Sequence, residues 1–187
     1  MKIDVSFTVP VPPDVAWPLL LDVPRIAPCV PGAALTEDLG EGRYKGEATV
    51  KVGPVQLTFA GEAKITDIDE ANRSARVVAK GMDRKGRGSA SATADFKLHP
   101  DGDGTRVDVA TDVQLVGAVA QYGRATGLVK DIAAQIVDQF AANLRAEISG
   151  EAAEGGAPNR ELSAMKLLGG AIKSKFSRGG GKDEPKE

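Results

Sequence analysis

The hydrophobic pattern of this chain changes its period near residue 118. Before that point, apolar and polar side chains alternate through successive segments, namely 44–52, 55–65, 75–81, 89–98 and 105–115. A period of two is typical of half-buried strands in an antiparallel sheet. Over residues 118–148, apolar side chains recur instead every three or four residues, which indicates one face of a long helix. The chain must therefore pack a sheet against a C-terminal helix.

The first 32 residues add a strand and two short helices to this pattern. Residues 2–9 alternate again and predict a strand, whereas residues 10–32 are rich in proline and favour two short helices followed by a loop that ends at Gly32. The order of elements predicts an α+β domain over residues 1–148, in which an antiparallel sheet grips the long helix.

Composition excludes several classes of protein. The formal net charge of −2 is too low for a typical nucleic-acid-binding protein, and a single cysteine excludes an internal disulfide framework and a multi-cysteine metal site. No apolar run approaches the ~20 residues of a membrane-spanning helix, and residues 1–9 lack the apolar core of a signal peptide. We expect a protein of the reducing cytoplasm.

The inward positions of the predicted sheet carry unusually small side chains. Gly61 and Ala63 lie on one segment, Ala79 on the next, and Ala90, Ala92 and Ala94 on a third. Because protein interiors are close-packed, either the helix lies very close to the sheet or an apolar cavity remains between them. Hydrogen-bonding groups on the inward faces are Thr111, Tyr122 and Thr126. The candidate cavity residues are Phe59, Gly61, Ala63, Val77, Ala79, Ala92, Ala94, Phe96, Val109, Thr111, Val119, Tyr122, Thr126, Val129 and Ile136.

No constellation for catalysis is apparent. Nucleophilic or acid–base chemistry needs partnered groups, but His99 is expected in a solvated loop and Cys29 lies in a proline-flanked turn without a nearby histidine. The strand acids fall on the outward phase. These are Glu47, Glu62, Asp95, Asp108 and Asp112. We therefore expect no catalytic residues, no metal site and no covalently bound cofactor.

A basic cluster and a basic tail remain to be explained. Lys80, Arg84, Lys85 and Arg87 are most simply a solvated hairpin, and their functional alternative is docking to an acidic partner or to lipid headgroups. Residues 149–159 predict a flexible linker.

Residues 160–187 predict a basic amphipathic tail that is disordered in solution and binds membranes, although Gly169 and Gly170 weaken a helix there. A groove on a partner protein and an idle tail are the alternatives. The candidate membrane-binding residues are Leu162, Met165, Lys166, Leu168, Ile172, Lys173, Lys175, Phe176 and Arg178.

Five segments together resemble a known family. They are WPLLLD at 17–22, CVPG at 29–32, VKVGPVQLTFAG at 50–61, GAVAQYGR at 117–124 and QIVDQF at 135–140. Over about residues 1–148 the chain resembles the CoxG subunit of carbon monoxide dehydrogenase, of the START-like or SRPBCC superfamily. The resemblance implies a helix-grip fold, a non-catalytic accessory role for aerobic carbon monoxide dehydrogenase or a related molybdenum hydroxylase, and a hydrophobic ligand between sheet and helix.

The resemblance and the residues together predict a membrane adaptor. The domain would hold a lipophilic molecule, with a non-covalently bound respiratory quinone as the best candidate, and the tail would attach it peripherally to the inner face of the cytoplasmic membrane. The molybdenum hydroxylase would be its protein partner and would pass electrons to the membrane. Two alternatives stay open, namely a ligand-free recruitment or assembly scaffold, and a small hydrolase or cyclase that uses the cavity.

Overall fold

The computed structural model describes residues 1–123 and 126–150, and all of them belong to one unit, Met1–Glu154. The elements follow the predicted order. They are β1 (Lys2–Val9), α1 (Pro13–Leu21), α2 (Val23–Ile26), the 3₁₀ helix η1 (Ala27–Cys29), β2 (Ala33–Gly40), β3 (Arg43–Val52), β4 (Val55–Asp69), β5 (Ser74–Asp83), β6 (Gly88–Asp101), β7 (Gly104–Gly117), α3 (Ala120–Gly123) and α4 (Thr126–Ser149).

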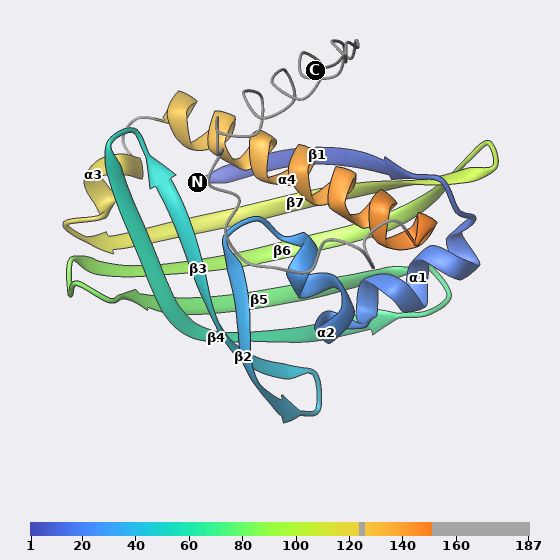
Figure 1. The fold of residues 1–187 in the computed structure, drawn as a ribbon, viewed down its shortest axis with the longest axis horizontal. Coiled ribbons are helices and arrows are strands. Elements are labelled where there is room, and N and C mark those ends of the chain that lie inside the picture. The colour runs from blue at the N-terminus through green and yellow to red at the C-terminus, as the bar shows by residue number, and fades with distance from the viewer. Residues whose placement is uncertain (124–125, 151–187) are drawn as a thin grey trace, which may run out of the picture. The chain divides into compact units, whose positions relative to one another are not determined.

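The seven strands form one antiparallel sheet in the order β1-β7-β6-β5-β4-β3-β2. The sheet curves, and α4 runs along it, packing mainly against β1 and η1 (Figure 1). This confirms the predicted α+β arrangement of a curved antiparallel sheet around a C-terminal helix.

The predicted helix over residues 118–148 is wrong at its beginning. The structure has a four-residue helix, α3, and the long helix α4 starts only at Thr126. Glycines at 117, 123 and 127 disfavour a continuous helix here, because each costs about 1 kcal/mol relative to alanine within a helix. At the other end, Gly150 adopts a φ of 78°, the left-handed conformation in which glycine commonly terminates helices.

Two apolar clusters fill the inner face of the sheet at its opposite ends. The first joins α1 and the C-terminal half of α4 to the sheet and contains the fully buried Leu144 and Val107. The second joins the β3–β4 hairpin to the segment before α3 and contains Val52, Leu57 and the fully buried Val119.

Side-chain hydrogen bonds fix the C-terminal half of α4. The Asn143 amide donates to the Cys29 carbonyl at 2.9 Å, and the Arg145 guanidinium donates to the Thr8 carbonyl at 2.8 Å. Arg25 donates to the Glu147 carboxylate at 3.0 Å. These bonds hold the helix over β1 and η1, which leaves the centre of the sheet to be covered by other elements.

Candidate ligand cavity

A cavity of about 310 Å³ opens on the inner face of the sheet. It lies between the two apolar clusters, as the residues of β4 show. Leu57 belongs to the second cluster, Gly61 lines the cavity, and Ile65 packs against the first cluster. Its lining is largely apolar and comes from α2, η1 and strands β2 to β7. The lining residues are Val23, Ala27, Ala33, Ala34, Leu35, Tyr44, Lys45, Gly46, Glu47, Ala48, Phe59, Gly61, Glu62, Ala63, Ala79, Lys80, Gly81, Ala90, Ser91, Ala92 and Val113.

The floor of the cavity consists of small residues paired across neighbouring strands. Ala63 pairs with Ala79, and Ala79 pairs with Ala92. All three are only partly buried although they lie on the inner face. None of the described α4 residues lines the cavity. Of the two alternatives for the small inward residues, the described part of the chain contains a cavity, since none of the described α4 side chains fills the space.

A row of glycines bends the sheet beside this floor. Gly46 pairs with Gly61, and Gly61 pairs with Gly81. A Cβ atom on Gly61 would lie 1.9 Å from the Lys80 carbonyl oxygen, and one on Gly46 would lie 2.7 Å from the Ala34 carbonyl oxygen. Glycine is needed where backbones approach so closely, and the bend brings β2 and β3 around the cavity.

The structure brings together five of the predicted cavity residues, namely Phe59, Gly61, Ala63, Ala79 and Ala92. The remaining described candidates do not line the cavity. Phe96 and Val109 pack in the first cluster, Phe96 beside Trp17, whereas Val119 and Tyr122 belong to the second cluster. The others lie partly buried elsewhere in the domain, and they are Val77, Ala94, Thr111, Val129 and Ile136. The Thr126 side chain lies outside the described residues.

Tyr44 is the polar lining residue on the inward phase that the candidate set omitted. The other omitted polar lining residues lie on the opposite phase of their strands, and they are Lys45, Glu47, Glu62, Lys80 and Ser91. Tyr44 pairs with Ala63, so its side chain lies on the inner face beside the floor. Burial, with smaller contributions from Asp38 and Asp22, raises the pKa of the Tyr44 hydroxyl, which therefore stays protonated as a hydrogen-bond donor. The alternation of β3 indicates that Tyr44 faces inward, but its place at the cavity depends on strand register.

An inward carboxylate, Asp83, was also missed. It lies opposite Phe59 and is 4% exposed. Its two oxygens accept hydrogen bonds from Arg87 Nε and Nη2, both at 2.7 Å, and from the backbone N–H groups of Lys85 and Arg87. These bonds, with Arg87 as the largest cause, hold the Asp83 pKa far below its usual range. Because both oxygens are occupied, Asp83 is a poor general base. It is a structural group that does not line the cavity.

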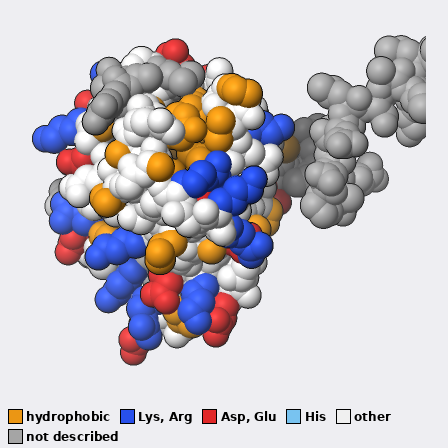
Figure 2. Space-filling model, turned by 90° about the vertical axis from the view of Figure 1, so that its left-hand side faces the viewer, with side chains coloured by type: hydrophobic (Ala, Val, Ile, Leu, Met, Phe, Trp, Pro, Cys, Tyr) orange, Lys and Arg blue, Asp and Glu red, His pale blue; other side chains and the backbone are white. Residues whose placement is uncertain are grey.

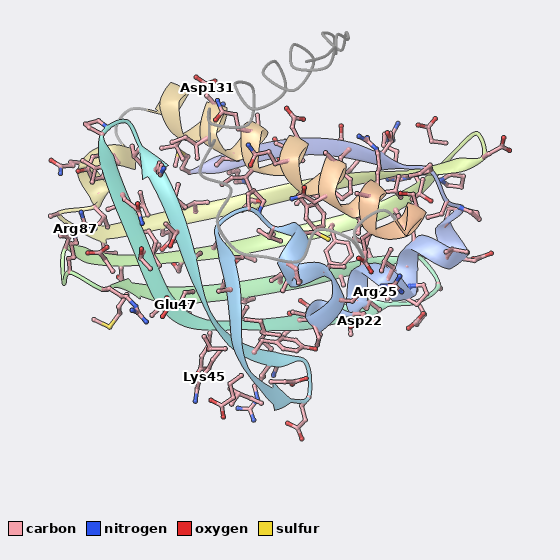
Figure 3. All side chains as sticks on the ribbon, in the orientation of Figure 1. Asp22, Arg25, Lys45, Glu47, Arg87 and Asp131 are labelled. Atoms are coloured by element: carbon pink, nitrogen blue, oxygen red, sulfur yellow. The ribbon has the colours of Figure 1, made fainter. Side chains whose placement is uncertain are left out.

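Arg87 therefore differs from the solvated hairpin cation that the sequence predicts. Its Nη2 atom also donates to the Gln56 carbonyl at 2.9 Å, and its own carbonyl accepts from Val119 at 3.1 Å. Figure 3 shows Arg87 at the end of the β5–β6 hairpin, apart from Lys45 on β3. The Asp83–Arg87 pair ties together the β3–β4 hairpin, the β5–β6 hairpin and the start of α3.

The two remaining reactive side chains have structural surroundings. Cys29 is buried, and burial together with the Glu147 charge raises the pKa of its thiol, which disfavours the nucleophilic thiolate. His99 lies within β6 and not in the expected loop, with its Nε2 atom 3.3 Å from Asp108 on the outer face of the sheet. Among the described residues, no group of three potential ligands is arranged to hold a metal ion.

The predicted linker beyond Gly150 and the predicted membrane-binding tail, including all nine of its candidate residues, lie outside the described residues. The division into domain, linker and tail therefore stays a prediction. No helix within residues 1–123 and 126–150 is both long enough and apolar enough to span a bilayer.

A comparison with protein families identifies the chain. The model of the family formed by the CoxG subunit of carbon monoxide dehydrogenase matches residues 6–149. The chain belongs to the CoxG family. Membership of this family indicates an accessory role for carbon monoxide dehydrogenase and confirms the resemblance seen in the sequence. No curated protein sequence matches the chain.

Several solved structures share the fold of this chain at low sequence identity. A conserved protein from Geobacillus kaustophilus has a TM-score of 0.68 at 21% identity, over 81% of this chain and 97% of that one. A protein from Thermus thermophilus has a TM-score of 0.56 at 17% identity, over 81% and 99% of the two chains. The Zhui aromatase/cyclase from a Streptomyces species has a TM-score of 0.51 at 17% identity, over 82% and 94%. These likenesses confirm the predicted helix-grip fold.

Proposed function

We propose that this CoxG protein is a non-catalytic adaptor that binds a lipophilic ligand in the cavity and links carbon monoxide dehydrogenase, or a related molybdenum hydroxylase, to the cytoplasmic membrane. The observation that carries the proposal is the apolar cavity between two well-packed clusters. Its volume of about 310 Å³ is near the lower end of the range of about 300–1,000 Å³ for ligand pockets.

The lining of the cavity favours an apolar ligand over water. Side chains such as Ala63, Ala92 and Val113 offer water no hydrogen bonds, so water in the cavity has few partners and is easily displaced. Each Å² of apolar surface removed from water contributes roughly 25 cal/mol. A lipophilic molecule is therefore stabilised here mainly by burial.

A respiratory quinone is the best candidate for that molecule. The floor of glycine and alanine residues suits a flat ring, Phe59 and Leu35 provide apolar walls, and the Tyr44 hydroxyl is a protonated donor for a ring carbonyl. Oxidation of carbon monoxide with water yields carbon dioxide, two protons and two electrons. One quinone that takes up two electrons and two protons becomes a quinol, so a membrane-borne quinone balances the reaction of the proposed partner enzyme.

The tail supplies the proposed attachment to the inner face of the membrane. Residues 160–178 carry five basic side chains and one acidic side chain beside a stripe of five apolar residues. Each lysine or arginine near an anionic leaflet contributes about 1 kcal/mol, so charge alone would contribute several kcal/mol to the binding of this segment.

Ligand binding is tested by extracting purified full-length protein with organic solvent and identifying the lipophiles by mass spectrometry. We expect a quinone in stoichiometric amounts from the wild type and from Thr93→Phe, whose side chain lies on the outer face of β6. We expect none from Ala92→Phe, which fills the cavity from the inner face of the same strand. Only host fatty acid, or equal quinone in all three proteins, contradicts the proposal. Full enzyme recruitment by an empty Ala92→Phe protein would instead favour a ligand-free scaffold.

The tether is tested separately by co-sedimentation with anionic and neutral vesicles. The intact chain should pellet with anionic vesicles, and a chain that ends at Gly150 should pellet much less. Equal pelleting of the two proteins would exclude the tail as the principal attachment.

A further inference from the structure

Three turns of the folded domain meet at one end of the sheet. They are the β3–β4 turn at 53–54, the β5–β6 turn at 84–87 and the segment 118–119 between β7 and α3. Arg87 bonds to Gln56 and Val119 bonds to Arg87, so the three turns form one fixed surface, which we call the hairpin end. Figure 2 faces this end of the molecule and shows hydrophobic side chains gathered beside a group of Lys and Arg side chains.

The hairpin end is positively charged although the domain is not. Residues 1–150 contain 17 basic and 20 acidic side chains. At the hairpin end the balance is reversed, since four cations face two carboxylates. The cations are Lys51, Arg84, Lys85 and Arg87, and the carboxylates are Glu47 and Asp83.

The cations at this end differ in whether they form ion pairs. Arg84 is paired with Glu47, and Arg87 with the buried Asp83. Lys51 and Lys85 are exposed and form no ion pair with any described residue. The groups that are free to meet a partner are therefore lysines, which act as flexible point charges. Arginine, the residue suited to fixed bidentate pairing with a protein carboxylate, is already engaged here.

Exposed apolar side chains accompany these lysines. Met82 is 70% exposed and Val116 is 63% exposed, and strand register places both next to Ser89 on the outer face of the sheet. Pro54 and Ala118 are exposed at the tips of two of the turns. These side chains lie outside both apolar clusters, so burying them requires a surface from outside the domain.

We propose that the hairpin end is a membrane-contact surface of the folded domain, in which Lys51 and Lys85 bind anionic lipid headgroups while Met82, Val116 and Ala118 enter the interface. An anionic leaflet attracts basic side chains without requiring a fixed geometry, and shallow apolar side chains add to that attraction. The surface supplements the proposed tail and orients the domain with its strands directed toward the membrane. The opposite turn, which carries Asp101 and Asp103, then points away from the lipid.

The orientation is tested with full-length protein labelled at one introduced cysteine by an environment-sensitive fluorophore. Cys29 is 5% exposed and is not expected to react. With vesicles containing about a third phosphatidylglycerol, emission from a label on Ala118→Cys should shift to shorter wavelength. A label on Asp103→Cys should not shift, and neither label should shift with neutral phosphatidylcholine vesicles.

The lysines are tested by neutralisation in the same full-length background. Lys51→Gln combined with Lys85→Gln should weaken binding to anionic vesicles by about 30-fold, because each lysine near the leaflet contributes about fivefold. The control combines Lys64→Gln with Lys97→Gln, two exposed lysines away from the hairpin end, and should bind like the wild type.

Vesicle binding without a shift at position 118 would overturn this surface while leaving the tail tether intact. Absence of any vesicle binding would overturn both. A shift at position 118 on addition of purified partner enzyme, with none on addition of anionic vesicles, would assign the hairpin end to a protein and overturn the lipid proposal.

Discussion

At the scale of single residues, Asp83 and Arg87 form the most consequential polar contact of the hairpin end. The Asp83 side chain has no solvent exposure, and four hydrogen bonds stabilise its ionised form. Removing one partner of a buried pair leaves an uncompensated charge, which is strongly destabilising. Arg87 also bridges two hairpins, so loss of the pair should loosen the end of the sheet that we assign to membrane contact.

We expect Asp83→Asn to lower the melting temperature at neutral pH more than Glu47→Gln, which removes the partly exposed partner of Arg84. The folded-state pKa of Asp83 lies below its unfolded value of about 3.9, so its stabilisation is present above that pH and is lost as pH falls toward the folded-state pKa. The difference between wild type and variant should therefore shrink below about pH 4. Thermal melts between pH 2.5 and 7 measure it, and a difference independent of pH would contradict this role for Asp83.

At the scale of elements, the shape of the cavity depends on how β4 bends. Gly61 lies in the middle of this long strand, between Gly46 on β3 and Gly81 on β5. Glycine normally weakens a strand, so three glycines in register need a reason. The reason here is the close approach of neighbouring backbones, which lets the outer strands turn back over the inner face of the sheet.

Gly61→Ala should destabilise the domain by about 1–3 kcal/mol, because the new Cβ would lie 1.9 Å from the Lys80 carbonyl oxygen. Gly127→Ala is the matched control, since a Cβ there meets nothing within 4 Å, and it should stabilise α4 by up to about 1 kcal/mol. Urea unfolding of the two variants measures the difference. Equal stability of Gly61→Ala and wild type would show that the strands separate easily at this point.

At the scale of the whole domain, the interior is divided between two filled clusters and a hollow centre. The first cluster holds α4 in place through Leu144 and Phe140. The Phe140 ring packs edge-on against the Phe7 ring, with 5.4 Å between the ring centroids. The second closes the hairpin end through Val119. Both clusters are formed by side chains of the domain itself, so their packing involves no ligand.

A ligand that binds only the folded state should raise thermal stability. At a free concentration 100 times its dissociation constant, the gain is about 2.7 kcal/mol, or roughly 5–10 °C for a domain of this size. We expect this shift when the quinone from the extraction experiment is added to delipidated wild type, and no shift for Ala92→Phe. Differential scanning calorimetry measures both proteins. The same shift in both would place the ligand outside the cavity.

Local patterns predicted the strands well, because alternation is a property of each segment alone. The alternation predicted which residues of β3 to β7 point inward, and Ala63, Ala79 and Ala92 were assigned to the site on that basis. The start of α4 was not predicted, since the periodicity continues across residues 118–125 while the glycines interrupt the helix. Tyr44 and Asp83 were missed because their surroundings depend on register and on contacts between hairpins.

The sequence by itself determined the order of elements, the sheet-and-helix fold and the small side chains on the inner face, since these depend on neighbours along the chain. Only the tertiary structure decided that the small side chains enclose a cavity. That outcome depends on where α4 lies, and the bonds of Asn143 and Arg145 hold α4 over η1 and β1 at the sheet edge. The bend at Gly61 then carries β2 and β3 around a space that none of the described α4 side chains fills.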